Sequence, residues 1–171
     1  MTGLERNADV VHLATYAPLF AHVDAWQWNP DLIWFDNLRM MRTPNYYVQQ
    51  MYGMNAGTDV LRLQMDGKPV AGQDSLYATA SPRITPYRGE NYPESWSTQA
   101  VPPAQVQVNF NGLRKRQLIG GSCTYLQNCD WRTVNTLEQE ALVPRIRPVQ
   151  VGAQSLDLEL QPRSFSVYRL H

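Results

Sequence analysis

The chain has 171 residues, and its 15 Lys and Arg residues balance its 15 Asp and Glu residues, so the formal net charge is zero. Phosphate binding needs clustered cations, and the longest basic run, residues 114–116, is too short for this, so we exclude nucleic acid as a partner. No apolar window approaches the ~20 residues of a membrane-spanning helix, so no membrane partner is expected either.

The first predicted element is an amphipathic helix that begins at Asn7. Apolar residues recur at helical spacing from Val10 to Ala17, and the Asn7 side chain can cap the first turn. Pro18 removes a backbone hydrogen bond and should kink or end this helix. His12 falls on the polar side, which favours a solvated histidine over a chemical role.

Three tryptophans follow between residues 25 and 37. Trp26 and Trp28 alternate with polar residues, a spacing that predicts a strand with both rings on one face. Two interpretations stay open for Trp28. Its large ring either fills space in a core or an interface, or stacks on the C–H-rich face of a sugar.

A strand and a helix are predicted next. Residues 32–35 are apolar and bulky, which predicts a buried strand. A helix should begin at Thr43 and Pro44, because the threonine hydroxyl can cap the first turn and proline is tolerated at the first helical position. This helix should end near Gly57. Its apolar stripe consists of Tyr47, Val48, Met51 and Tyr52.

After residue 57 the pattern changes to the two-residue alternation of β-strands. Turn signals at Asp66-Gly67 and Asn111-Gly112 separate the segments. Short strands about ten residues apart indicate an antiparallel β-sandwich. The expected strands are residues 60–65, 75–80, 105–110, 116–119, 133–137, 142–147, 155–160 and 164–170.

Other stretches of this region lack a clear period. Residues 81–104 contain several prolines and predict a long loop. Its aromatic residues Tyr87, Tyr92 and Trp96 either pin the loop to the sandwich or form a glycan-binding edge. Residues 123–131 predict an irregular insertion or a bulged strand, and the polar residues 138–140 predict a solvated patch.

Four motifs in the first 60 residues closely resemble the end of the catalytic barrel of family 51 glycoside hydrolases, the α-L-arabinofuranosidases. They are Gly3-Leu-Glu-Arg-Asn7, Ala14-Thr-Tyr-Ala-Pro-Leu-Phe20, Trp28-Asn-Pro-Asp-Leu-Ile-Trp-Phe-Asp-Asn37 and Thr43-Pro-Asn-Tyr-Tyr-Val48. The match beyond residue 60 is looser. It rests on motifs such as Gly72-Gln-Asp-Ser-Leu-Tyr-Ala78 and Leu160-Gln-Pro-Arg-Ser-Phe-Ser-Val-Tyr-Arg-Leu170.

The resemblance implies a (β/α)8 barrel joined to a C-terminal β-sandwich of jelly-roll type, in an enzyme that removes terminal arabinofuranosyl groups with retention. Residues 1–57 would form the end of the barrel, a helix–strand–helix remnant, and residues 58–171 the sandwich. A complete barrel needs about 250 residues, so the chain is expected to be the C-terminal part of a longer enzyme. The implied partner is an arabinose-containing oligosaccharide or polysaccharide, such as arabinan or arabinoxylan.

The resemblance places Trp28 and Asn29 near the rim of the arabinose pocket, as the substrate-binding candidates. Pro30 and Asp31 follow, where some relatives carry a glutamine. Retaining hydrolysis needs two carboxyl groups about 5 Å apart, and the two catalytic glutamates of the family would lie upstream of Met1. Asp36 is interpreted as a turn residue. No catalytic residue is expected here, because none of the carboxylates lies in a catalytic motif. The carboxylates considered are Glu5, Asp31, Asp36, Glu90, Glu94 and Asp130.

No cofactor and no metal site are expected. His22 and Asp24 have the spacing of metal ligands but lack a third partner. Cys123 and Cys129 show no zinc-type spacing with the three histidines. The two cysteines either close a small disulfide loop in an exported protein or stay free in a cytoplasmic one, and the localisation is left open.

Two functions of different classes follow. The principal hypothesis is the C-terminal part of an arabinofuranosidase, whose sandwich supports the barrel and which is inactive by itself. The alternative is a carbohydrate-binding β-sandwich module without catalysis. The apolar stripes of residues 10–20 and 47–52 need a cover, so these helices should either fold back on the sandwich or pair between copies of the chain.

Overall fold

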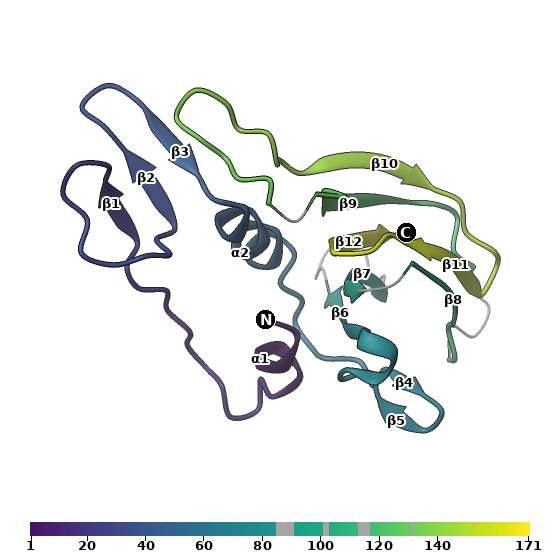
Figure 1. Cartoon of the computed structure of the whole chain (residues 1–171). Coiled ribbons are helices and arrows are strands. Elements are labelled where there is room, and N and C mark those ends of the chain that lie inside the picture. Colours follow the sequence, from purple (N-terminus) through teal and green to yellow (C-terminus); the bar gives the residue numbers. More distant parts are fainter. Residues whose placement is uncertain (85–90, 101–102, 113–116, 131) are drawn as a thin grey trace.

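The computed structural model describes residues 1–84, 91–100, 103–112, 117–130 and 132–171, with side chains for all of these except residues 83–84 and 91–100. The described chain is mainly β, as expected (Figure 1). Its helices are α1 Thr2–Arg6, α2 Pro44–Met54 and the 3-10 turn Gln73–Ser75. Its strands are β1 Phe20–His22, β2 Ile33–Phe35, β3 Met40–Arg42, β4 Gln64–Met65, β5 Lys68–Pro69, β6 Tyr77–Ile84, β7 Asn91–Ala100, β8 Ala104–Asn109, β9 Gly121–Gln127, β10 Arg145–Val149, β11 Ser155–Leu160 and β12 Ser164–Leu170. None of the described helices is long and apolar enough to cross a bilayer.

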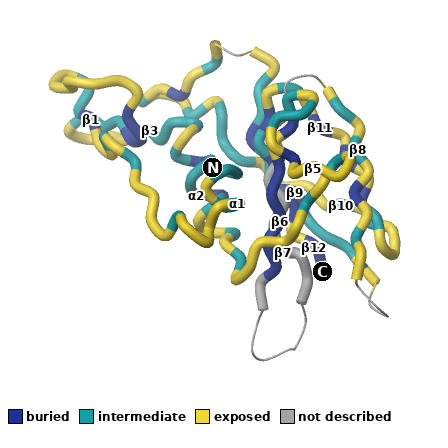
Figure 2. The backbone as a smooth tube through the Cα atoms, turned by 90° about the horizontal axis from the view of Figure 1, so that it is seen from below, coloured by how far each residue is buried: buried dark blue, intermediate teal, exposed yellow. Residues whose placement is uncertain are grey.

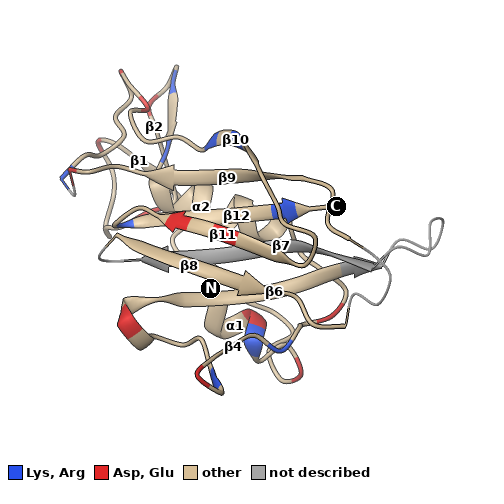
Figure 3. Ribbon diagram, turned by 90° about the vertical axis from the view of Figure 1, so that its right-hand side faces the viewer, with Lys and Arg blue, Asp and Glu red and all other residues tan. Residues whose placement is uncertain are grey.

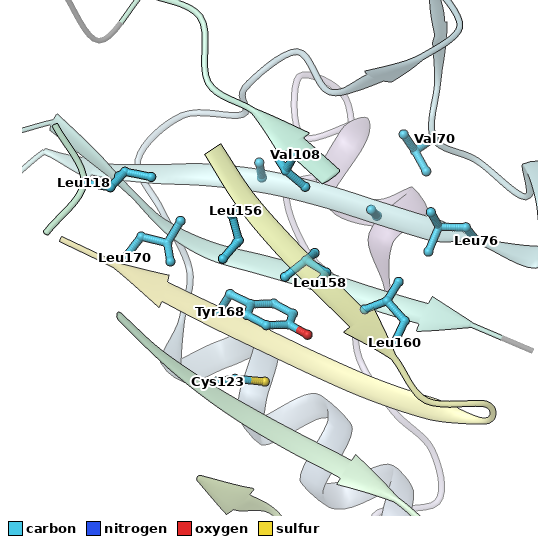
Figure 4. Close-up of a cluster of buried hydrophobic side chains, with 12 residues drawn as sticks. Val70, Leu76, Val108, Leu118, Cys123, Leu156, Leu158, Leu160, Tyr168 and Leu170 are labelled. Atoms are coloured by element: carbon cyan, nitrogen blue, oxygen red, sulfur yellow. The ribbon is translucent and has the colours of Figure 1, made fainter. Parts of the chain in front are cut away.

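The largest sheet, here called the main sheet, has five antiparallel strands in the order β10-β9-β12-β7-β6. Strands β8 and β11 form a small antiparallel sheet that covers one face of it. Leu156, Leu158 and Leu160 alternate along β11 and pack with Tyr168 and Leu170 of β12 (Figure 4). This layer is the larger apolar core, and burying each such side chain contributes about 1.5–3 kcal/mol.

Helix α2 covers the opposite face of the main sheet. Its Tyr47 and Met51 pack against Leu126 of β9 and Val167 of β12. Successive side chains of a strand point to opposite faces, so Val167 faces the helix while Tyr168 faces the small sheet. The apolar stripe of residues 47–52 therefore folds back on the β-structure, which is one of the two outcomes expected for it.

The predicted start of α2 is confirmed, whereas its end lies at the C-cap Asn55 and does not use the positive φ expected of Gly57. Thr43 is the N-cap, and its hydroxyl accepts a hydrogen bond from the Tyr46 N–H at 3.4 Å. Pro44 occupies the first helical position, where its missing N–H costs nothing. The helix ends at Met54, and Asn55 follows as the C-cap.

Strands β1, β2 and β3 form a second unit, here called the N-terminal sheet, which lies apart from the main sheet (Figure 1). Strand β1 pairs with β2 in parallel, with Phe20 opposite Ile33, and β2 pairs with β3 antiparallel, with Ile33 opposite Arg42. The predicted strand at residues 32–35 is thus confirmed. Exposed residues are frequent in this unit, whereas β6 and β12 are largely buried (Figure 2).

The helix expected from Asn7 onward is wrong. The helix of this region is α1, which ends at Arg6, and the Asn7 side chain donates to the Gly3 carbonyl at 2.7 Å, so it closes the helix instead of starting one. Val10 and Leu13 are exposed. A short helix gains most of its stability from packing its apolar face, and no described element covers these two side chains.

The long loop expected at residues 81–104 is also wrong. Strands β6 and β7 pair through Ile84 and Asn91, with a register shift between Ser81 and Pro82. Strand β6 is an edge strand, and β12 pairs with β7 only at residues 97–100. Pro82 and Pro93 thus lie where the ladder is irregular or has no second neighbour, and there the missing N–H is tolerated.

Several smaller expectations are corrected as well. Residues 117–119 and 133–137 are not strands, and of residues 60–65 only β4 is one. Of the two alternatives for residues 123–131, the irregular insertion is wrong for residues 123–127, which belong to strand β9, and the strand pairs with β10 and β12 without the expected bulge. The turn at Asp66-Gly67 is confirmed, because both residues have positive φ and join β4 to β5. Strands β8 and β11 follow the predicted alternation closely, whereas β12 is buried on both of its faces.

We predict that α2 is held mainly by its buried face. Met51 is 4% exposed and Met54 is 64% exposed on the same helix. Met51→Ala should lower the free energy of unfolding by about 2–5 kcal/mol, and Met54→Ala by less than about 0.5 kcal/mol. Urea unfolding of both variants checks this, and equal losses would contradict the packing described for α2.

We also predict a pH dependence from α1, whose Glu5 faces the hydroxyls of Thr79 and Ser81 on β6. Burial raises the pKa of Glu5 more than these hydroxyls lower it. The folded state then binds the proton more tightly, so this group stabilises the fold below pH 4.5 and loses that contribution as the pH rises through the raised pKa. Glu5→Gln should flatten the fall in unfolding free energy between pH 4.5 and 7, measured by urea titration, while the exposed Glu138→Gln should keep the wild-type slope.

Candidate functional site

The predicted substrate-binding residues, Trp28 and Asn29, lie in the segment that joins the parallel strands β1 and β2. This segment consists of turns and bends, so the strand expected around Trp26 and Trp28 is wrong. The reason is topological. The chain must return from the end of β1 to the start of a parallel β2 within residues 23–32, which leaves little room for a straight strand.

The two tryptophan rings of this segment are both on the surface. Trp28 is 63% exposed and Trp26 is 51% exposed. The Trp26 ring meets the edge of the Trp34 ring with centroids 5.8 Å apart. Trp28 therefore does not fill the core of this chain, and its ring is available for contact with a ligand or with another part of a protein.

Residues 16–19 hold the start of β2 in place. The Leu32 N–H donates to the Pro18 carbonyl at 3.3 Å, and the Tyr16 hydroxyl reaches the Pro30 carbonyl at 3.5 Å. The Asn29–Pro30 and Ala17–Pro18 peptide bonds are both cis. We call Trp28 and Asn29, with Pro30 and Asp31, the rim segment (residues 28–31).

Two aspartates flank β2 in opposite environments. Asp31 is 2% exposed, and its Oδ2 accepts no hydrogen bond from the described residues. Asp36 is in the exposed β2–β3 turn and accepts from the backbone N–H groups of Leu38 and Arg39 and from the Arg39 guanidinium, at 2.6–3.0 Å. These bonds hold the pKa of Asp36 at about 2. The interpretation of Asp36 as a turn residue is confirmed.

A carboxylate that the sequence did not single out joins the N-terminal sheet to the rest of the chain. Glu140, in the loop between β9 and β10, accepts from Nε and Nη2 of Arg42 at 3.0 and 2.9 Å and from the Tyr47 hydroxyl at 2.5 Å. Asn135 of the same loop donates to the Arg42 carbonyl at 2.8 Å. We call Glu140, Asn135, Arg42 and Tyr47 the clasp.

The electrostatics of the clasp follow from these bonds. Burial works against the charge of Glu140, but the hydrogen bonds from Arg42 and Tyr47 lower its pKa overall. Burial and the bond to Glu140 raise the pKa of Tyr47 to about 12. At neutral pH the clasp therefore joins an ionised carboxylate to a guanidinium and a neutral phenol.

The prediction that residues 138–140 form a solvated patch is confirmed for Glu138 and wrong for Glu140. The Glu138 side chain is 72% exposed and meets Arg39 at 3.4 Å, whereas the Glu140 side chain is 21% exposed. The two residues are separated by one position, and no local feature of the sequence tells them apart. The difference is set by residues 39–47, which lie nearly a hundred positions away in the chain.

The remaining candidates do not gather into a site. The His22 ring packs edge-on against Phe35 at 5.3 Å, and its Nδ1 accepts from the Asp24 N–H at 3.2 Å. Among the described residues, no three His, Cys, Asp or Glu side chains come together. Cys123 is buried, Cys129 is exposed, and both are free thiols, so the disulfide alternative is wrong. The ribbon in Figure 3 shows the Lys, Arg, Asp and Glu positions of the described residues spread over many elements.

The proposed glycan-binding aromatics cannot be compared with this geometry. Tyr87 lies outside the described residues. Tyr92 and Trp96 belong to β7, of which only the backbone is described. A glycan-binding edge at these three residues therefore stays a prediction.

The chain matches the family model "Alpha-L-arabinofuranosidase C-terminal domain" over residues 1–164. It is 56% identical over 61 residues to an extracellular exo-α-L-arabinofuranosidase of Streptomyces chartreusis, a stretch that covers 36% of this chain and 7% of that protein. It is 28% identical over 174 residues to α-L-arabinofuranosidase 1 of Arabidopsis thaliana, covering 99% of this chain and 25% of that protein.

A solved structure with a similar fold is that of the arabinose-bound α-L-arabinofuranosidase MgGH51. It superposes with a TM-score of 0.80 at 24% sequence identity, over 99% of this chain and 26% of that one. The chain thus spans about a quarter of the length of the Arabidopsis and MgGH51 proteins. Since the family model covers nearly the whole sequence, this chain belongs to the family of C-terminal domains of family 51 α-L-arabinofuranosidases.

Proposed function

We propose that this chain is the C-terminal portion of a longer α-L-arabinofuranosidase, which removes terminal arabinofuranosyl groups from arabinan- or arabinoxylan-type glycans with retention. In this proposal, residues 1–57 complete a (β/α)8 barrel, and residues 58–171 form a jelly-roll sandwich that supports the barrel. The catalytic acid and the nucleophile lie outside this chain. Trp28 and Asn29 contribute one wall of the arabinose pocket.

The observation that carries the proposal is the uncovered apolar surface of the N-terminal sheet. Its β1–β2 pair is parallel, and parallel sheets are normally covered on both faces. Exposed apolar clusters of this kind mark contact sites, and the proposed cover is the rest of the barrel. The exposed side chains of this region are Leu13, Leu19, Phe20, Trp26, Trp28, Leu38 and Met40.

The two carboxyl groups in and near the rim segment, Asp31 and Asp36, are too far apart to be a catalytic pair, which supports a catalytic pair elsewhere. Asp31 precedes β2 and Asp36 follows it, so an extended strand separates their Cα atoms by about 16 Å, at ~3.3 Å per residue. Retaining hydrolysis needs a separation of about 5 Å between the carboxyl groups. Asp36 is moreover engaged by Leu38 and Arg39 in the turn.

Asp31 supports the same proposal in another way. A buried carboxylate oxygen without a donor is costly, and native proteins normally supply a partner. In the longer enzyme this partner would come from a barrel segment that packs over the start of β2. The apolar surface around the rim segment and the unpaired Asp31 oxygen would then be covered by the same neighbour.

The proposal predicts that the 171-residue chain does not hydrolyse an aryl α-L-arabinofuranoside, while the longer protein that contains it does. Release of the aryl alcohol measures both rates. Turnover by the chain alone above the background of a mock preparation would show that the catalytic pair is within it. An inactive longer protein would contradict the proposed activity itself.

Binding is tested separately by calorimetric titration of the chain with arabino-oligosaccharides. A single wall of a pocket should bind these sugars too weakly to give measurable heat, because most of the contacts are missing. Heat that disappears in Trp28→Ala would show that the rim segment binds sugar by itself. Heat that survives Trp28→Ala would favour a carbohydrate-binding module centred elsewhere on the chain.

For Asp31 we predict that Asp31→Asn raises the unfolding free energy of the isolated chain by about 1–3 kcal/mol, because a neutral amide is less costly to bury than a carboxyl group whose Oδ2 accepts no hydrogen bond from the described residues. Asp36→Asn should instead lower the stability, since it weakens the bonds of the β2–β3 turn. Urea unfolding at pH 7 measures both. A destabilised Asp31→Asn variant would mean that the carboxylate is already satisfied within this chain.

A further inference from the structure

We infer that Glu140 and Asn135 are positioning residues for the rim segment: the loop between β9 and β10 holds β3, and β3 fixes the start of β2. The inference deepens the proposed function and rests on it, because the rim segment contacts substrate only in that enzyme. Neither residue lies in the N-terminal part of the chain to which the rim segment belongs.

The loop binds the free edge of β3 as a neighbouring strand would. The Arg42 N–H donates to Glu140 Oε1 at 2.9 Å, and the Arg42 carbonyl accepts from Asn135 Nδ2 at 2.8 Å. Adjacent residues of a strand point their backbone groups to opposite sides. Accordingly, the N–H of the next residue, Thr43, points the other way and donates to the Leu32 carbonyl at 3.1 Å.

The loop is itself held firmly at this point. Asn135 is 5% exposed, and its amide bonds the Leu142 backbone on both sides, with Oδ1 accepting from the N–H at 2.7 Å and Nδ2 donating to the carbonyl at 2.9 Å. The Glu140 carboxylate grips the Arg42 guanidinium with two bonds, and the guanidinium also lies over the Tyr47 ring, 5.4 Å from its centroid. Bidentate pairs of this kind define a geometry as well as an energy.

Covalent and hydrogen bonds connect Arg42 to the rim segment over a short distance. Arg42 lies opposite Ile33, and the Thr43 hydroxyl donates to the Leu32 carbonyl at 2.9 Å. Leu32 directly follows Asp31, the last residue of the rim segment. A shift of β3 at Arg42 therefore moves the backbone from which Trp28 and Asn29 extend.

The fold of the chain has a separate support, so the clasp can be weakened without unfolding it. Met51 of α2 packs on Leu126 and Val167 independently of the Glu140 carboxylate, and the β8–β11 core lies on the other face of the main sheet. Glu138 provides a matched control, because it belongs to the same loop and pairs with Arg39 of the β2–β3 turn while most of its side chain is exposed.

The first experiment is amide hydrogen exchange on the 171-residue chain. Glu140→Gln should speed the exchange of the Thr43 and Ile33 amides by about tenfold, the effect expected when a hydrogen bond to a charged group is lost. Amides of Leu158 and Val167 should be unchanged, and Glu138→Gln should match the wild type throughout. Unchanged exchange at Thr43, or an equal rise in every strand, would overturn the positioning role.

The second experiment uses the longer enzyme with an aryl α-L-arabinofuranoside. Misplacing a binding wall removes ground-state and transition-state contacts together, so Glu140→Gln should raise KM several-fold and change kcat less. Glu138→Gln should leave both unchanged. An active enzyme whose KM is the same in Glu140→Gln overturns this inference alone. An inactive wild-type enzyme overturns the proposed function, whatever the exchange pattern of the chain.

Discussion

The N-terminal sheet is anchored by one loop, in which the Glu140 carboxylate makes most of the contacts and Asn135 adds a bond to the Arg42 carbonyl. Each strand of this sheet is three residues long, and so small a sheet is not stable in water by itself. Glu140 ties it to the main sheet through the backbone and the guanidinium of Arg42 and through the Tyr47 hydroxyl. The neighbouring pair of Glu138 and Arg39 is exposed, and pairs of that kind contribute little.

Helix α2 is a second link between the N-terminal sheet and the main sheet, because it contacts both of them. At its N-terminus the Thr43 hydroxyl binds Leu32 of the N-terminal sheet, while one turn later Tyr47 and Met51 are buried on the main sheet. The main sheet in turn is covered by α2 on one face and by β8 and β11 on the other. The sequence boundary expected at residue 57 therefore does not coincide with a gap in packing, and the division into two domains there stays a prediction.

Two neighbouring parts of the N-terminal region differ in how well they are covered: Arg42 is held by the β9–β10 loop, whereas most of the rim segment is exposed. At Arg42 the sheet is anchored by ionic and hydrogen-bonded contacts, whereas the rim segment presents the exposed Trp28 ring and a buried Asp31 oxygen that has no donor in the described part of the chain. Such a combination is costly in a self-contained unit and reasonable in one that meets a larger neighbour. In the proposed longer enzyme, the β9–β10 loop would hold the rim segment through β3, and the rest of the barrel would cover its exposed side.

The sequence by itself determined the family, from motifs such as Thr43-Pro-Asn-Tyr-Tyr-Val48, and the elements whose signals are local. Thr43 and Pro44 mark the start of α2, and the alternation of residues 155–160 marks β11, because caps and strand periodicity act between near neighbours. Only the tertiary structure decided the rest. Asn7 closes a helix instead of starting one, Pro82 and Pro93 lie within paired strands, and Glu140 differs from Glu138, since each outcome depends on contacts with residues distant in the chain.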